Sequence, residues 1–105
     1  MSPNITVKEL AEALKSAQPP FLLDVREPEE FRLANIGGVL IPLGELSQRL
    51  EELPDDREIV VLCHHGVRSG HGAALLRHHG FNKVRNISGG IDRYSAEVDP
   101  TIPRY

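Results

Sequence analysis

The stretch that decides the fold of this chain is Ile59-Val60-Val61-Leu62-Cys63-His64-His65-Gly66-Val67-Arg68-Ser69. Its apolar beginning is typical of a buried strand, and the segment 69–79 is typical of a helix that stops at Gly80. The only cysteine of the chain, Cys63, therefore stands in a short loop between a strand and a helix. Free N–H groups and the dipole at a helix N-terminus favour a negatively charged sulfur there. We expect a reactive thiolate at Cys63, with a buried structural thiol as the alternative.

Strand patterns and helix patterns alternate on both sides of this stretch. Short apolar runs predict strands at 21–25, 39–41, 58–62 and 83–87. Spaced apolar residues and stop signals predict further helices after Thr6, from Pro28, over the leucines of 43–53, and over 91–96. Because strands that alternate with helices form parallel sheets, we expect an α/β fold whose central, mostly parallel sheet carries helices on both faces. Ligands bind such sheets beyond the carboxyl ends of the strands, where Cys63 is expected.

Composition describes an ordinary globular protein, which we expect to form a single domain over residues 1–105. Hydrophobic residues make up 40% and charged residues 26% of the chain, and the formal net charge is −3. Such a mild negative charge gives no support for nucleic acid or a membrane as a partner. Charged residues and prolines interrupt every apolar run, so we expect neither a membrane span nor a secretory signal. A lone cysteine forms no intrachain disulfide, and a free thiol suits the reducing cytoplasm.

Several segments, in this order, resemble the rhodanese-domain family of sulfurtransferases over nearly the whole chain. They are the segment 22–31 (Leu-Leu-Asp-Val-Arg-Glu-Pro-Glu-Glu-Phe), the loop 63–69, and the closing segments 80–84 and 87–91. The tail 97–105 is similar to the end of rhodanese domains fused to enzymes that activate sulfur-carrier proteins. Two positions depart from the family pattern. Asn35 replaces a histidine, and Tyr94 stands nearest to the place of a tryptophan that usually follows the double glycine.

The resemblance implies a sulfurtransferase that works by double displacement. The Cys63 thiolate takes the outer sulfur of thiosulfate or of a persulfide donor, and the Cys63 persulfide passes it to a thiol or to cyanide. The tail implies a sulfur-carrier protein as a further partner. Two alternatives stay open: a rhodanese-like binding or sensing module with incidental activity, and a phosphatase or arsenate reductase of the same fold. The four residues between Cys63 and Arg68 favour sulfur transfer, because the related phosphatases have one more residue in a wider loop.

The loop residues divide into a nucleophile and substrate-binding groups. Cys63 is the expected catalytic residue, and the loop N–H groups are expected to stabilise anionic sulfur as an oxyanion hole does. Arg68 is expected to hold the sulfonate oxygens of the donor, or to tie the loop to a strand-end carboxylate such as Asp24. The expected substrate-binding residues are Arg68, His64, His65, Gly66, Val67 and Ser69.

Other polar residues have supporting roles in this prediction. Asp24 and Arg26 are expected to approach the loop from a neighbouring strand end, with a structural salt bridge as the alternative. Ser69 is expected to cap the helix. His64 and His65 are expected to adjust access or charge at the mouth of the loop and, if protonated, to attract an anionic donor. The spacing of the five histidines does not suit a metal site, and we expect neither a metal nor a cofactor.

Overall fold

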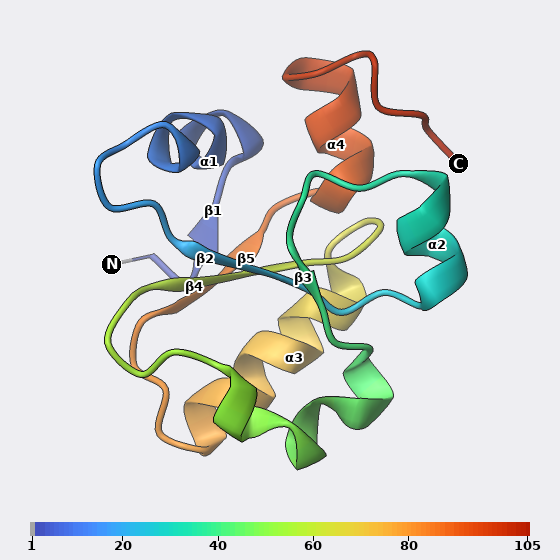
Figure 1. Cartoon of the computed structure of the whole chain (residues 1–105). Helices are drawn as coiled ribbons and strands as arrows, with labels where there is room; N and C mark the ends of the chain where they lie inside the picture. The colour runs from blue at the N-terminus through green and yellow to red at the C-terminus, as the bar shows by residue number, and fades with distance from the viewer. Residues whose placement is uncertain (1) are drawn as a thin grey trace.

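The computed structural model describes residues 2–105 and places five parallel strands in one sheet (Figure 1). In the spatial order β1-β5-β4-β2-β3, the strands are β1 (Asn4–Ile5), β5 (Val84–Ile87), β4 (Ile59–Leu62), β2 (Phe21–Asp24) and β3 (Val39–Leu40). Strand β4 lies in the middle and is buried along its whole length, which explains its continuous apolar sequence. The predicted parallel sheet is confirmed. Met1, the first residue of the expected single domain, lies outside the described residues.

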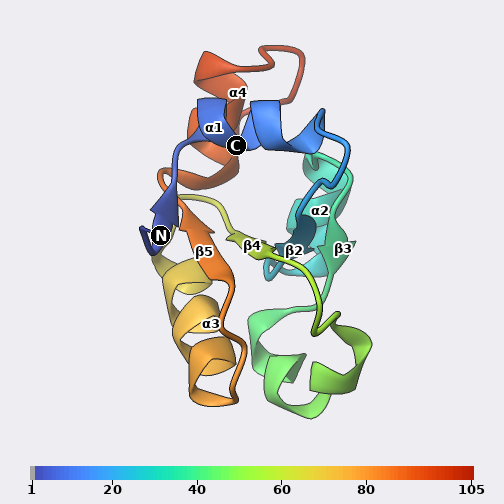
Figure 2. The same ribbon diagram turned by 90° about the vertical axis from the view of Figure 1, so that its left-hand side faces the viewer.

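Helices cover both faces of the sheet (Figure 2). They are α1 (Val7–Leu14), α2 (Pro28–Leu33), α3 (Val67–His78) and α4 (Gly90–Glu97). Helices α1 and α4 pack on one face, against a core that includes Leu22 and Val60. Helix α3 packs on the other face, against a core that includes Leu23 and Val61. Because neighbouring strand residues point to opposite faces, each strand contributes to both cores, and the predicted α/β layering is confirmed.

Two of the predicted helix starts are confirmed in detail. At α1, Thr6 Oγ1 accepts a hydrogen bond from the N–H of Glu9 over 3.1 Å, and Glu9 Oε1 accepts from the N–H of Thr6 over 2.9 Å. Pro28 opens α2, where its missing N–H costs nothing. Strand β1 was not predicted, because two residues are too few to show an alternating pattern. It is recognised only by its pairing with β5, in which Asn4 lies opposite Asn86.

The helix predicted over the leucines of 43–53 is wrong. This segment forms two short 3₁₀ helices, η1 (Leu43–Gln48) and η2 (Leu50–Glu52), which are separated at Arg49. Leu43 and Leu46 are three residues apart, and so are Leu50 and Leu53. A 3₁₀ helix has three residues per turn, so each pair lies on one side of its own turn, and the break at Arg49 supplies the extra residue between the pairs.

The tail after α4 returns along the molecule and is held at several points. The hydroxyl of Ser95 donates to the carbonyl of Ile102 over 2.5 Å, and Arg104 donates twice to the carboxylate of Asp92, each over 3.0 Å. These contacts bring the last residue, Tyr105, back to α2 (Figure 1). Within residues 2–105, no helix has both the length and the apolar character that crossing a membrane requires.

Candidate active site

The loop that carries Cys63 joins the carboxyl end of β4 to the start of α3. Gly66 is the N-cap of α3 and has a φ of 110°, a left-handed conformation that favours glycine. The N–H groups of Ile91 and Asp92, at the start of α4, donate to the carbonyls of Cys63 and His64 over 2.9 and 3.1 Å. These bonds fix the first half of the loop against α4.

The double glycine before α4 has a steric reason. A Cβ atom at Gly90 would lie 2.3 Å from the carbonyl oxygen of His64 and 2.5 Å from that of Cys63, closer than any side chain permits. Gly90 also has a φ of 61°, in the left-handed region. The absence of a side chain at Gly90 therefore allows the backbone at the start of α4 to approach the loop that carries Cys63. Tyr94, which stands near the family's tryptophan, is buried in the core under α1 and α4.

Cys63 is 1% exposed, and its sulfur has two hydrogen-bond partners within residues 2–105. The N–H of Gly66 donates to Sγ over 3.0 Å, as expected of a loop that stabilises anionic sulfur. Ser69 Oγ lies 3.2 Å from Sγ and is buried. The contributions expected from the other N–H groups of the loop stay predictions; these are the N–H groups of His64, His65, Val67, Arg68 and Ser69.

The cap expected from Ser69 is wrong. Helix α3 begins at Val67, two residues earlier than predicted, so the N-cap is Gly66, and it makes no side-chain cap. Ser69 thereby falls in the first turn, where its side chain points toward Sγ. Its hydroxyl also donates to Oδ1 of Asn86, a residue of β5 that the sequence analysis did not single out.

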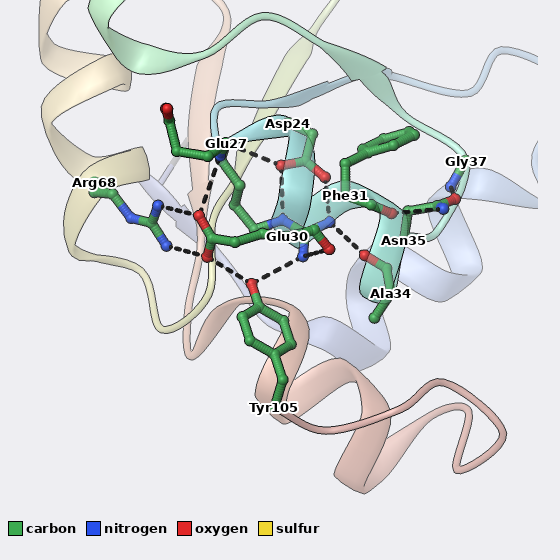
Figure 3. A network of polar contacts seen from close by, with 10 residues as sticks. Asp24, Glu27, Glu30, Phe31, Ala34, Asn35, Gly37, Arg68 and Tyr105 are labelled. Carbon is green, nitrogen blue, oxygen red and sulfur yellow. Dashed lines mark hydrogen bonds and ion pairs between the residues drawn. The ribbon is translucent and has the colours of Figure 1, made fainter.

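Arg68 forms a two-pronged ion pair with Glu30 of α2, with N–O distances of 2.6 and 2.8 Å (Figure 3). The proposed partner Asp24 is therefore incorrect, because the side chain of Asp24 is engaged elsewhere. The hydrogen bonds that Arg68 donates are the main reason why the pKa of Glu30 is lowered to about 2. Burial raises this pKa, and the hydrogen bonds from the N–H of Glu27 and from Tyr105 lower it further. Arg68 keeps 36% of its side chain exposed.

Asp24 and Arg26 form a buried pair with each other. Asp24 lies opposite Leu62 in the β2–β4 ladder, so this end of β2 lies beside the strand residue that precedes Cys63. Its carboxylate accepts from Arg26 Nε over 2.9 Å and from Nη2 over 2.7 Å, and neither side chain is accessible. Arg26 also donates to the carbonyl of Ala34 over 2.7 Å. This closed set of bonds favours the structural alternative for the pair.

Tyr105 links the two ion pairs. Its hydroxyl accepts from Arg26 Nη1 over 2.9 Å and donates to Glu30 Oε2 over 2.8 Å (Figure 3). Its ring stacks on His64 with a centroid distance of 3.9 Å, and His64 stacks in turn on His65 at 3.9 Å. Burial, followed by the charge of His65, lowers the pKa of His64. A lowered pKa works against the attraction of an anionic donor that His64 would exert if it were protonated.

Two remaining expectations concern metals and Asn35. Among residues 2–105, no three His, Cys, Asp or Glu side chains converge as a metal site requires. Asn35 is exposed, accepts from the N–H of Gly37 over 3.0 Å and donates to the carbonyl of Phe31 over 3.1 Å. Asn35, one of the two departures from the family pattern, therefore forms its side-chain hydrogen bonds with residues close to it in sequence, around the end of α2.

The fold and the site define a class of protein: an α/β domain that holds one thiol in a tight loop between its central strand and a helix N-terminus. The chain belongs to the rhodanese-like domain family, whose model matches residues 6–97. A sulfurtransferase of Allochromatium vinosum is 33% identical over 93% of this chain and 92% of its own length.

Two further proteins show how the domain is used and shaped. The Bacillus subtilis protein YrkF, provisionally named a sulfur carrier protein, is 37% identical over 92% of this chain. This chain spans only 53% of YrkF, and 30% of another relative, so several curated relatives are longer proteins. The solved structure of a rhodanese-related protein from Thermoplasma volcanium superposes with a TM-score of 0.85, covers 99% of this chain and 100% of its own, and is 30% identical.

Proposed function

We propose that this protein is a sulfurtransferase that moves a sulfane sulfur from thiosulfate or a persulfide donor to a thiol or cyanide through a persulfide on Cys63. The observation that carries the proposal is the position of Cys63 Sγ, at the carboxyl end of β4 and 3.0 Å from the N–H that opens α3. A negatively charged sulfur is stabilised at such a helix start. Membership of the rhodanese-like family supports the reaction class.

The reaction proceeds in two displacements. The Cys63 thiolate attacks the outer sulfur of thiosulfate, the sulfur–sulfur bond of thiosulfate breaks, and sulfite leaves with the bonding electron pair. A cyanide ion or a thiolate then attacks the terminal sulfur of the Cys63 persulfide. The sulfur–sulfur bond breaks, the Cys63 thiolate is released with the bonding electron pair, and thiocyanate or the acceptor's new persulfide forms. The N–H of Gly66 stabilises the anionic sulfur of Cys63 before the first step and after the second.

Arg68 is proposed to bind the sulfonate end of the donor. A guanidinium carries five N–H donors, and Glu30 receives two hydrogen bonds from Arg68. Within residues 2–105 the hydrogen bonds of the Arg68 side chain go to Glu30 alone. The remaining donors, on a side chain that is 36% exposed, are proposed to bind anionic oxygens while the ion pair stays formed. Gly66, Val67, Ser69, His64 and His65 complete the proposed donor site through the loop backbone.

The partners follow from the same chemistry. The donor is a small sulfane-sulfur compound, and a sulfur-carrier protein is proposed as a physiological partner. Support comes from the similarity to YrkF and from the sequence of the tail. The transfer itself needs no cofactor, and a nucleophilic free thiol suits the reducing cytoplasm, where we place the protein.

One observation favours a second function. Cys63 is 1% exposed, so a donor reaches the sulfur only if the loop or its surroundings move. A rhodanese-like binding or sensing module with incidental turnover is consistent with such burial. A phosphatase or arsenate reductase of the same fold is less well supported, because four residues separate Cys63 from Arg68.

The experiment is intact-mass spectrometry after incubation with thiosulfate, followed by cyanide. We expect a gain of one sulfur atom that cyanide removes as thiocyanate, and no gain in Cys63→Ser, whose circular dichroism stays that of the wild type. Because Cys63 is the only cysteine, the site of the added sulfur needs no mapping. A wild-type mass that does not change with any sulfane donor would leave the binding module as the better function. Sulfur uptake by Cys63→Ser would contradict the mechanism.

A further inference from the structure

Asn86 lies beside the loop on strand β5, where it pairs with Val61 of β4 and is half-buried. Its Nδ2 donates to the carbonyl of Gly66 over 3.1 Å, and its Oδ1 accepts from the hydroxyl of Ser69. Both bonds reach the residues that contact the sulfur of Cys63. Within residues 2–105 the side-chain hydrogen bonds of Asn86 go to Gly66 and Ser69. Asn86 therefore has no part in the two displacements proposed for Cys63.

The side-chain amide of Asn86 has one possible orientation. The carbonyl of Gly66 can only accept hydrogen bonds, and it already accepts from the N–H of Gly70 over 3.1 Å. The NH₂ group of Asn86 must therefore face Gly66, which leaves Oδ1 facing Ser69. Because Oδ1 can only accept, the hydroxyl of Ser69 must donate to it.

This arrangement creates a competition for one proton. The hydroxyl of Ser69 has a single hydrogen, and both Asn86 Oδ1 and Cys63 Sγ lie within its reach, Sγ at 3.2 Å. When Cys63 is a thiol, its S–H donates to Ser69 Oγ while the Ser69 hydrogen stays on Asn86, and every group is satisfied. When Cys63 is a thiolate, it needs the Ser69 hydrogen, and Asn86 Oδ1 then loses its donor.

We propose that Asn86 is a positioning residue that competes with the Cys63 thiolate for the hydrogen of Ser69 and so keeps more of the resting Cys63 in the thiol form. A thiol is attacked by oxidants and alkylating agents more slowly than a thiolate, so the competition protects the nucleophile at rest. The proposal rests on the proposed function only in taking Cys63 as the nucleophile. Its test measures proton binding at the sulfur and needs no sulfur transfer.

Charged and titratable groups also surround the loop. Arg68 interacts electrostatically with Cys63, and it is partnered by Glu30 and lies near Tyr105. His65, Asp92 at the start of α4, and Glu30 interact electrostatically with His64, the residue next to Cys63. All of these groups are unchanged by substitutions at Asn86 and Ser69. Their influence therefore cancels when such variants are compared with one another.

The test is the pH profile of the alkylation of Cys63 by iodoacetamide, in which the thiolate displaces iodide. In Asn86→Leu, Ser69 is free to donate to Sγ, and we expect the midpoint of the profile to fall by about one pH unit, which is roughly tenfold more thiolate below the midpoint. In the Ser69→Ala background, the same substitution at Asn86 is expected to leave the midpoint unchanged. Asn82→Leu, at an exposed position just before β5, is the matched control and is expected to behave as the wild type.

The paired backgrounds separate the proposal from a loosened loop. Loss of the bond to Gly66 acts in both backgrounds, whereas the competition for the proton needs Ser69. A midpoint that stays or rises in Asn86→Leu, or that shifts equally with and without Ser69, would overturn the proposal. If the protein lost sulfur uptake in every form yet gave the predicted shift, the proposed function would fail and this inference would stand.

A second measurement covers the case in which Asn86→Leu does not fold. The S–H stretching band in the Raman spectrum belongs to Cys63 alone, because the chain has no other thiol. A thiol that donates to Ser69 Oγ has a lowered stretching frequency, and we expect the band to move to higher frequency in Ser69→Ala. An unshifted band would show that Ser69 accepts no hydrogen bond from the thiol and would overturn the proposed direction of the bonds.

Discussion

Two arginine–carboxylate pairs beside the loop have the same chemistry and opposite surroundings. The Asp24–Arg26 pair has side chains that are 1% and 0% exposed, whereas the side chains of Glu30 and Arg68 are 19% and 36% exposed. Both pairs are bidentate, and the hydroxyl of Tyr105 bonds to a member of each (Figure 3). Burial is therefore the main physical difference between them.

This difference assigns different roles to the two pairs. The side chains of the Asp24–Arg26 pair are inaccessible to solvent. Arg26 also donates to the carbonyls of Ala34 and Glu30 and to the hydroxyl of Tyr105. Such a pair holds the end of β2 to the segment after α2. Arg68 is partly exposed, and within residues 2–105 its side chain bonds to Glu30 alone, which is why we propose that it binds an anion while the ion pair stays formed. We therefore expect substitutions in the first pair to affect stability and substitutions in the second to affect donor binding.

The largest effect is expected from Arg26→Leu. Removal of one member of a buried pair leaves the carboxylate of Asp24 without its partner in an inaccessible site, and we expect a loss of about 3–5 kcal/mol in the free energy of unfolding. Urea denaturation measures this loss. The double variant Asp24→Leu/Arg26→Leu removes both charges and is expected to recover much of it.

Arg85→Leu is the matched control for this prediction. Arg85 pairs with Glu58 at 2.8 Å, but both side chains are 20% exposed, and we expect a loss of about 1 kcal/mol or less. Equal losses in Arg26→Leu and Arg85→Leu would show that burial does not distinguish the pairs and would remove the basis of the comparison.

The second-largest effect, on the binding of the sulfur donor, is expected from Arg68→Ala. Loss of the guanidinium should raise the KM for thiosulfate about tenfold, which corresponds to about 1.4 kcal/mol, with a much smaller change in stability than Arg26→Leu. Arg49→Ala is the matched control, because Arg49 is 34% exposed and is paired with Glu45 and Glu52 on η1 and η2. Steady-state formation of thiocyanate at varied thiosulfate measures both. An unchanged KM in Arg68→Ala would assign Arg68 to a purely structural role.

The fold was predictable from sequence where the signal is local. The apolar run of β4, the capping box of α1 and Pro28 at the start of α2 each depend on neighbouring residues, and each prediction was confirmed. The segment around Leu43 was not predictable in the same way. Leucines at spacings of three and four fit an α-helix as well as two 3₁₀ turns, and only packing distinguishes them.

The position of Cys63 in the candidate site was predictable from the sequence, whereas the partners of the other side chains were less so. Cys63 and the N–H of Gly66 follow from a strand, a loop and a helix that are contiguous in sequence. The partner of Arg68 depends on how α2 lies against α3, and nothing local separates Glu30 from Asp24 as a candidate. Tyr105 is 75 residues away from Glu30, and no pattern in the sequence connects the two.

The smallest effect is expected from Glu30→Gln, on the free energy of unfolding and its dependence on pH in the acid range. Its pKa falls from an ordinary value of 4.5 to about 2 in the folded protein, mainly because Arg68 donates to it. A lowered carboxyl pKa contributes stability that is fully present above about pH 4.5 and is lost as the pH falls through about 2. Because Arg68 is partly exposed and therefore screened, we expect Glu30→Gln to cost about 1 kcal/mol at pH 7.

The pH dependence of that cost distinguishes the ion pair from a simple loss of packing. Glutamine has the shape of glutamate but does not titrate, so the difference between wild type and Glu30→Gln should shrink between pH 4.5 and pH 3 and should fall further in 1 M salt. Urea unfolding of both proteins across this range measures it. A difference that is the same at pH 3 and pH 7 would mean that the charge of Glu30 adds nothing to its hydrogen bonds. The Glu30–Arg68 pair would then contribute to stability through its hydrogen bonds alone.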